Sequence, residues 1–274
     1  MNERIAQLVD SAGSLPREIL AKYRIKEVPL YFTFDNEHYY RENIDYSNSD
    51  FYIHMKEKPS QVPKTSAPNV YDWLSGFNEM YEKGYDKLIV TTIASRLSAS
   101  FQNALQARDL FLESVRDAKI KVFDSGTCAC GQAALEIRIA EMINHRQMQW
   151  EDIINRTKEL IPKATSLFSV QELTYMKAGG RIGGATAFLG KLINIKPVCE
   201  FVDGIVHPVG AIRCRNKALE YMANICVSRI KNACNTIIVI QNALCEKDEL
   251  FLTEKLKQIL GQDIRIYHSG VGAS

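Results

Sequence analysis

A strand–turn–helix pattern occurs twice in succession in the first half of the chain, and it limits the available folds more than any other feature. Lys87–Ile93 is a nearly continuous apolar run, and after a short turn Phe101–Arg116 has the pattern of a helix. Lys119–Asp124 and Cys128–Asn144 repeat this arrangement. Continuous apolar strands are typical of buried parallel sheets, and alternating strands and helices favour an α/β fold. The sequence therefore predicts a parallel sheet flanked by helices.

The pattern changes after Pro162, where shorter strands and helices follow one another less regularly. Strands are expected at Ser166–Val170, Lys196–Val202, Ile205–Gly210, Thr236–Ile240 and Asp263–His268. Helices are expected at Glu172–Lys177, Thr186–Ile193, Lys217–Ile230 and Cys245–Leu260. Asp203-Gly204 between two of the strands is a hairpin signal. We therefore expect an α/β domain over residues 1–164 and an α+β domain with a mixed sheet over residues 165–274.

One further strand is expected nearer the start of the chain. Glu27–Phe34 is rich in β-branched and aromatic residues, and Pro29 places this strand near an edge or a start. The polar stretch that follows is expected to hold a hairpin turn and then a helix near Ser49–Lys58.

Charge and hydropathy exclude several classes of protein. The chain has 34 basic and 32 acidic residues, and no dense Lys/Arg run suggests a nucleic-acid partner. No run approaches the ~18 apolar residues that would span a bilayer, and the first residues lack a signal-peptide core. We therefore expect a soluble protein.

The seven cysteines do not suggest a disulfide framework, because their number is odd and none lies in the first 127 residues. This distribution favours a reducing cytosol. Cys128 and Cys130 lack the two-residue gap of common zinc and redox motifs, so we expect inert thiols and no metal site.

The strongest local signal for function is the turn after Lys87–Ile93, which contains Ser95, Ser98 and Ser100. A helix that begins at the carboxyl end of a parallel strand points free N–H groups outward and favours an anion. Ligands of open parallel sheets bind at this edge. Serine also commonly caps helices, so this segment alone leaves capping and anion binding equally supported.

Three other segments carry polar groups that could join such a site. Thr65 and Ser66 supply hydroxyls in a loop, and Arg181 lies among four glycines in the segment 177–184. His268 stands near the C-terminus before Ser-Gly-Val-Gly. Taken singly, Thr65, Ser66 and His268 are better explained by loop or structural roles, whereas Arg181 could meet an anion. The sequence has no Gly-x-Ser-x-Gly nucleophile motif and no zinc-protease pair of histidines.

Together these segments resemble the DegV family of bacterial fatty acid-binding proteins. The matching pieces occur in the family's order and spread over the whole chain, which makes the set more specific than any one motif. They are Val9–Pro16, Thr65–Pro68, Ile93–Ala104, Tyr175–Ile182, Lys196–Val198, Gly204–Val206, Ile212–Ala218 and His268–Gly272. Departures from the family pattern are mild and comprise Ala67, Ala94, Ala99, Ala178 and Val271.

The resemblance implies a two-domain DegV-like α/β fold with a long-chain fatty acid bound in a buried tunnel between the domains. It implies that Thr65 and Ser98 hold the carboxylate and that His268 lies beside them. Relatives present the acyl group to a separate fatty acid kinase, and Arg181 and Arg213 match family arginines near the head-group end. Ser95 and Ser66 are further candidates that lie nearby or face the partner.

On this hypothesis the chain is a cytoplasmic carrier and co-substrate of a kinase subunit, not an enzyme. It needs no cofactor beyond its bound fatty acid, has no nucleic-acid partner and no membrane span, and leaves transient membrane contact open. The alternative is a phosphotransferase or hydrolase that uses Ser98 with His268 as base on a small anionic substrate. A third hypothesis is a regulatory or scaffolding protein with incidental lipid.

Overall fold

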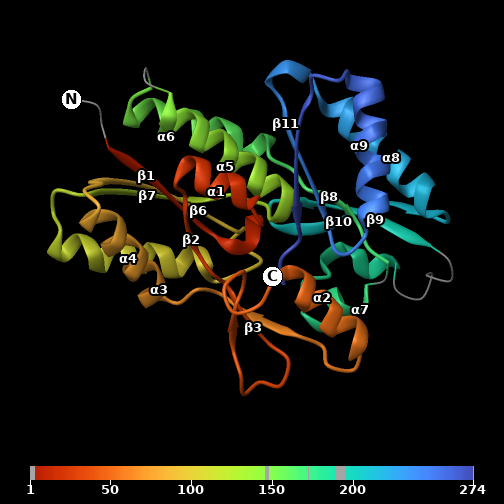
Figure 1. The fold of residues 1–274 in the computed structure, drawn as a ribbon, viewed down its shortest axis with the longest axis horizontal. Coiled ribbons are helices and arrows are strands. Elements are labelled where there is room, and N and C mark those ends of the chain that lie inside the picture. The colour runs from red at the N-terminus through yellow and green to blue at the C-terminus, as the bar shows by residue number, and fades with distance from the viewer. Residues whose placement is uncertain (1–3, 146–147, 172, 189–194, 274) are drawn as a thin grey trace.

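The computed structural model describes residues 4–145, 148–171, 173–188 and 195–273. A four-stranded parallel sheet forms the centre of the N-terminal half, with the strand order β2-β1-β6-β7 (Figure 1). Its strands are β1 (Ile5–Asp10), β2 (Lys26–Val28), β6 (Lys87–Thr92) and β7 (Lys119–Asp124). The predicted parallel sheet is therefore confirmed.

Helices cover both faces of this sheet (Figure 1). The helices are α1 (Arg17–Tyr23), α3 (Val70–Glu82), α4 (Ser100–Ser114), α5 (Ala129–Asn144) and α6 (Trp150–Leu160). Because side chains alternate along a strand, Val90 of β6 packs with α3 and α4 while Ile89 packs with α5 and α6. Burial on both faces explains why these strands are continuous apolar runs.

The expected strand Glu27–Phe34 is divided between two sheets, so that prediction is wrong. β2 ends at Val28 on the edge of the parallel sheet, and β3 (Tyr31–Thr33) begins a separate antiparallel sheet. The cause lies between them. Pro29 has no N–H to donate, and the N–H of Leu30 donates to Ser11 Oγ at 2.9 Å instead of to a strand.

The antiparallel sheet and one helix form a small aromatic lobe, which we define as residues 31–66. It contains β3, β4 (Tyr40–Arg41), β5 (Lys64–Ser66) and α2 (Asn48–Glu57). Phe32 is 1% exposed. Its ring lies 4.9–5.6 Å, centroid to centroid, from the rings of Phe34, Tyr40, Tyr46 and Phe51. This packing fixes β5, because Phe32 pairs in register with Thr65.

The C-terminal half has the α+β character that was expected, and its strands are divided between two sheets. One is antiparallel, with the order β10-β9-β8, and the other is the parallel pair β11-β12. The strands are β8 (Leu167–Ser169), β9 (Lys196–Val202), β10 (Ile205–Ile212), β11 (Ile237–Asn242) and β12 (Arg265–Gly270). The helices are α7 (Thr174–Ala178), α8 (Arg215–Arg229) and α9 (Glu246–Leu260).

Two local predictions in this half have clear outcomes. The Asp203-Gly204 hairpin is confirmed, and both residues have positive φ, 48° and 71°. The expected helix Thr186–Ile193 is wrong at its start, where Gly183–Phe188 forms a 3-10 helix, η3. Its remaining residues lie outside the described part of the chain. Gly183 has φ 49°, and a Cβ at this position would lie 2.9 Å from the carbonyl oxygen of Val206, so glycine is needed here.

The two halves pack closely where the chain passes between them. Val9, Ile19 and Ile137 share one apolar cluster with Val239 of β11. The N–H of Gly131 donates to Ser166 Oγ at 2.8 Å. A domain boundary near residue 164 stays a prediction, and this cluster shows that β11 packs on α5 across it. Within the described ranges, no helix has the length and apolarity needed to cross a membrane.

Candidate functional site

The carboxyl edge of the parallel sheet is organised around the buried carboxylate of Asp10, at the end of β1. Asp10 is 1% exposed. Its Oδ2 accepts from the backbone N–H of Ile93 at 2.9 Å and from Ser100 Oγ at 2.6 Å. Its Oδ1 accepts from Gln132 Nε2 at 2.8 Å. One carboxylate therefore joins β1, α5 and both ends of the turn after β6. Burial raises the pKa of Asp10, while these donors lower it.

The serine turn, residues 93–100, leads directly into the first residue of α4. Ser98 is half-buried, and its Oγ accepts from the backbone N–H of Ser100 at 3.3 Å. This bond uses a lone pair and leaves the Ser98 hydroxyl hydrogen available to donate to an anion. Ser95 is exposed, and its N–H donates to Asp124 Oδ2 at 3.2 Å. Ser98 can therefore accept the N–H of the first residue of α4 and donate to an anion at the same time.

The loop that carries Thr65 and Ser66 lies against the first turns of α4. Both residues are exposed on β5. Asn103 of α4 donates from Nδ2 to the carbonyl oxygen of Pro68 at 2.8 Å. The structure therefore brings the two hydroxyl segments to neighbouring positions.

The glycine-rich segment reaches the same turn from the C-terminal half. Arg181 is exposed, and its Nε donates to the carbonyl oxygen of Leu97 at 3.2 Å. The turn of the β9–β10 hairpin lies against the loop after β7, because the N–H of Gly204 donates to the carbonyl oxygen of Gly126 at 2.8 Å. A Cβ on Gly204 would lie 2.8 Å from the Cβ of Ala94, so glycine is needed for this close approach.

His268 lies on β12 and has an acidic partner that the sequence did not reveal. Its Nδ1 lies 2.6 Å from Oε1 of Glu249, on α9, and its side chain is 41% exposed. The carboxylate orients the imidazole. Beyond His268 the chain returns to the segment that follows β1, where the N–H of Gly272 donates to Ser14 Oγ at 2.8 Å. Across the described ranges, the contacts recorded do not join His268 to Ser98 or Thr65.

The remaining candidate, Arg213, lies in the C-terminal half. Arg213 is exposed in the connection between β10 and α8. The neighbouring Arg215 forms a salt bridge, since its Nε lies 2.7 Å from Asp248 Oδ2.

Burial raises the pKa of Cys128 and of Cys130, which agrees with the expectation of inert thiols.

A half-buried acidic group, Glu27, also makes stability depend on pH. Burial and the charge of Glu42 raise the pKa of Glu27 from 4.5 to about 7. The unfolded chain releases this proton at lower pH than the folded chain, so the group penalises the folded state increasingly as pH rises from about 4.5 to about 7. Glu27→Gln is therefore expected to raise the free energy of unfolding at pH 8, by at most about 3 kcal/mol, and to have little effect at pH 4.

Urea unfolding at the two pH values measures this effect. The exposed Glu18→Gln variant is the matched control, because Glu18 lies at the start of α1 and away from the buried acids. Equal stability changes for the two variants at pH 8 would show that Glu27 is not the group responsible.

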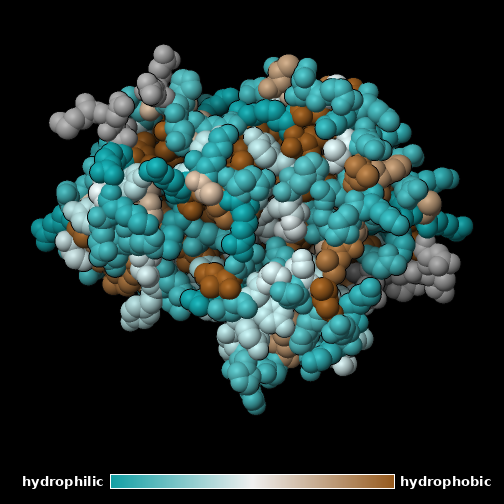
Figure 2. Space-filling view, viewed as in Figure 1, coloured by the Kyte–Doolittle hydropathy of each residue, from teal (hydrophilic) through white to brown (hydrophobic). Residues whose placement is uncertain are grey.

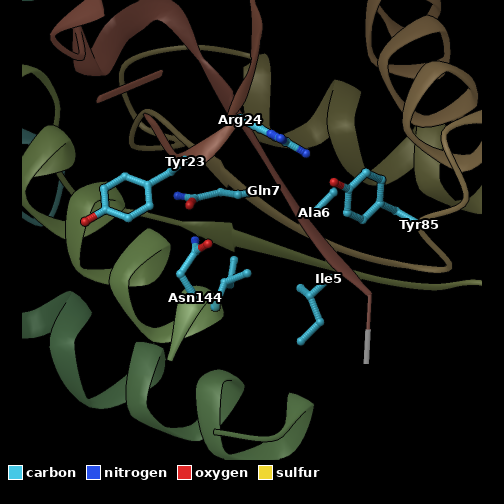
Figure 3. A pocket seen from close by; sticks show the side chains of 8 residues that line it. Ile5, Ala6, Gln7, Tyr23, Arg24, Tyr85 and Asn144 are labelled. Atoms are coloured by element: carbon cyan, nitrogen blue, oxygen red, sulfur yellow. The ribbon is translucent and has the colours of Figure 1, made fainter. Parts of the chain in front are cut away.

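Two of the cavities among the described residues lie away from the serine turn. One, of about 20 Å³, lies at the amino ends of β1 and β6 (Figure 3). It is lined by Ile5, Ala6, Gln7, Tyr23, Arg24, Tyr85, Ile143 and Asn144. The other, of about 440 Å³, lies along α5 and α6 between polar and apolar side chains. Neither of these two is the predicted acyl tunnel. The face of the molecule shown in Figure 2 is largely hydrophilic, with scattered apolar patches.

Comparison with known proteins relates this geometry to one family. The family model described as an uncharacterised protein, DegV family, matches residues 4–274. A DegV domain-containing protein of Listeria innocua is 32% identical over 232 residues, which cover 85% of this chain and 80% of that protein.

Solved structures agree over nearly the full length. A stearic acid-binding protein from Eubacterium ventriosum is 29% identical, with a TM-score of 0.89, over 99% of this chain and 92% of the other. DegV from Bacillus subtilis, a fatty acid-binding protein, is 28% identical, with a TM-score of 0.83, over 99% of this chain and 93% of the other. The match to the family model, the sequence identity and the shared fold lead to one conclusion: this chain belongs to the DegV family.

Proposed function

We propose that this chain binds one long-chain fatty acid and carries it without transforming it. The carboxylate is received at the serine turn by Ser98 and Thr65, and the acyl chain lies between the two halves. The observation that carries the proposal is the Ser98 hydroxyl, which has a hydrogen to donate at the N-terminus of α4 beside the Thr65 loop. Solved relatives that share the fold bind fatty acids.

The chemistry of the head group supports this location. Burying a carboxylate without partners is costly, and hydroxyl and backbone N–H donors offset that cost. The N-terminus of α4 adds a partial positive charge. Neutral donors avoid the tight bidentate pair that arginine forms, so one carboxylate oxygen stays accessible. His268, oriented by Glu249, is the proposed third contact.

Apolar side chains at the serine turn provide the start of the path for the acyl chain. Ala12, Leu30 and Ile93 form a buried cluster against which Leu97 and Cys128 pack. A second cluster between η3 and the β8–β10 sheet is joined to this turn by Arg181. An acyl chain on this path separates side chains that pack together here, and burial of each CH₂, at ~0.8 kcal/mol, offsets the cost.

We further propose that a fatty acid kinase subunit phosphorylates the bound carboxylate, with the exposed residues Ser66, Ser95, Arg181 and Arg213 near the encounter surface. An ATP-dependent step of this kind places the protein in the cytoplasm. The test is to incubate the loaded protein with ATP and a DegV-partnering kinase and to trap acyl phosphate with hydroxylamine. Hydroxamate that forms only when both proteins are present supports the proposal, and none contradicts it.

Arg213→Ala is expected to slow hydroxamate formation about tenfold while leaving the Kd for fatty acid unchanged, because Arg213 is exposed and lies outside the hydroxyl site. Lys231→Ala, at an exposed position beyond the end of α8, is the control for general loss of positive charge. Equal slowing in both variants would contradict a specific role for Arg213.

The His268–Glu249 pair favours a second candidate, a hydrolase or phosphotransferase in which Ser98 is the nucleophile and His268 the base. This function requires Ser98-dependent turnover of a small acyl or phosphoryl ester. Turnover of p-nitrophenyl acetate or p-nitrophenyl phosphate that disappears in Ser98→Ala would support it. Turnover that is equal in both proteins, or absent, would rule it out for these substrates.

A further inference from the structure

We infer that Asp10 is a positioning residue for the fatty acid head-group site, and that it acts on Ser98 through Ser100. The inference rests on the proposed function and adds a residue that does not touch the ligand. Three features carry it: the buried carboxylate of Asp10, its bonds to both ends of the serine turn, and the bond from Ser100 to Ser98.

The first step is closure of the turn by one oxygen atom. Oδ2 of Asp10 accepts from the N–H of Ile93 at 2.9 Å and from the hydroxyl of Ser100 at 2.6 Å. These residues are the two ends of the serine turn. A single acceptor therefore sets the distance between the end of β6 and the start of α4, and with it the shape of the segment between them.

The second step is the orientation of the Ser98 hydroxyl. Ser100 is fully buried, and its side chain is fixed by Asp10. Its backbone N–H then donates to Ser98 Oγ at 3.3 Å. With one lone pair of the oxygen engaged, the hydroxyl hydrogen is directed elsewhere and can meet a carboxylate.

The third step is the placement of Asp10 itself by side chains of α5. Gln132 Nε2 donates to Oδ1 of Asp10 at 2.8 Å and to Oε1 of Glu136 at 2.8 Å. Glu136 is fully buried, and burial together with the charge of Asp10 raises its pKa well above the ordinary value. Gln132 and Glu136 therefore lie behind an Asp10 carboxylate that accepts hydrogen bonds on both of its oxygens. This arrangement fixes the carboxylate from the side opposite the serine turn.

The experiment compares an 18-carbon fatty acid with the 18-carbon alcohol, which lacks the charged head group. Delipidated parent protein, Ser100→Ala, Asp10→Ala and Asp10→Asn are titrated with both ligands. Ser114→Ala is the matched control, because its hydroxyl lies at the far end of α4 and donates within the helix to Phe111. Urea unfolding of each variant accompanies the titrations.

Ser100→Ala and Asp10→Ala are expected to weaken acid binding about tenfold and alcohol binding less than twofold. Asp10→Asn recovers most of the affinity, because its amide oxygen still accepts from Ile93 and Ser100. Ser114→Ala matches the parent. If Asp10→Ala does not fold, Ser100→Ala and Asp10→Asn decide the question.

Other results overturn the inference. Equal losses of affinity for the acid and the alcohol would show that Asp10 and Ser100 have a purely structural role. Unchanged affinity for the acid in Ser100→Ala would show that Asp10 does not act on Ser98 through Ser100. Failure of the proposed function looks different, because the parent protein itself would then bind neither ligand.

Discussion

Ser98→Ala is expected to weaken binding of a long-chain fatty acid by about 10- to 100-fold, which corresponds to one hydrogen bond to a charged group at about 1.5–3 kcal/mol. The side chain is half-buried at the start of α4, so water replaces the lost donor poorly. Thr65→Ala is expected to cost less, because Thr65 is exposed on β5. Isothermal titration of delipidated protein with an 18-carbon fatty acid measures both effects.

Stability is expected to change little in either variant, because neither hydroxyl is buried in a core. Ser114→Ala, at the far end of α4, controls for removal of a serine hydroxyl away from the site. If both Ser98→Ala and Thr65→Ala bind with the parent's affinity, the carboxylate is held elsewhere and the assignment of the site is wrong.

Phe32→Ala is expected to lower the free energy of unfolding by about 3–5 kcal/mol, the usual cost of removing a large side chain from a packed core. Phe32 is 1% exposed and lies at the centre of the aromatic lobe. Its loss leaves four neighbouring rings without a shared contact. Because Phe32 pairs with Thr65, the same variant is expected to weaken fatty acid binding.

Urea denaturation followed by circular dichroism measures this loss of stability. Tyr39→Ala is the matched control, since Tyr39 is an aromatic residue of the same hairpin with 56% of its surface exposed. Similar losses for Phe32→Ala and Tyr39→Ala would contradict a core centred on Phe32.

The parallel sheet and the serine turn could be predicted from sequence because their signals are local. A strand buried on both faces is a continuous apolar run, and the turn that follows it is polar over a few residues. The division of Glu27–Phe34 was missed for a different reason. Whether the chain continues past Pro29 depends on where the N–H of Leu30 finds an acceptor, and Ser11 supplies it from another segment.

The residues that hold the site together could not be predicted in the same way. Asp10 bonds to Ile93 across 83 positions and to Gln132 across 122 positions, so no local spacing indicates either contact. One signal was present, because Asp10 is a carboxylate at the end of an apolar strand. Family resemblance indicated His268, and only the fold shows its partner Glu249.

The central claim is that a fatty acid is bound inside this protein, and its most direct test needs no variant. The protein is purified without added lipid, extracted with organic solvent, and the extract is quantified by mass spectrometry against protein concentration. About one long-chain fatty acid per chain is the predicted result. An extract without fatty acid, from a protein that also takes up none when it is offered, would contradict the account.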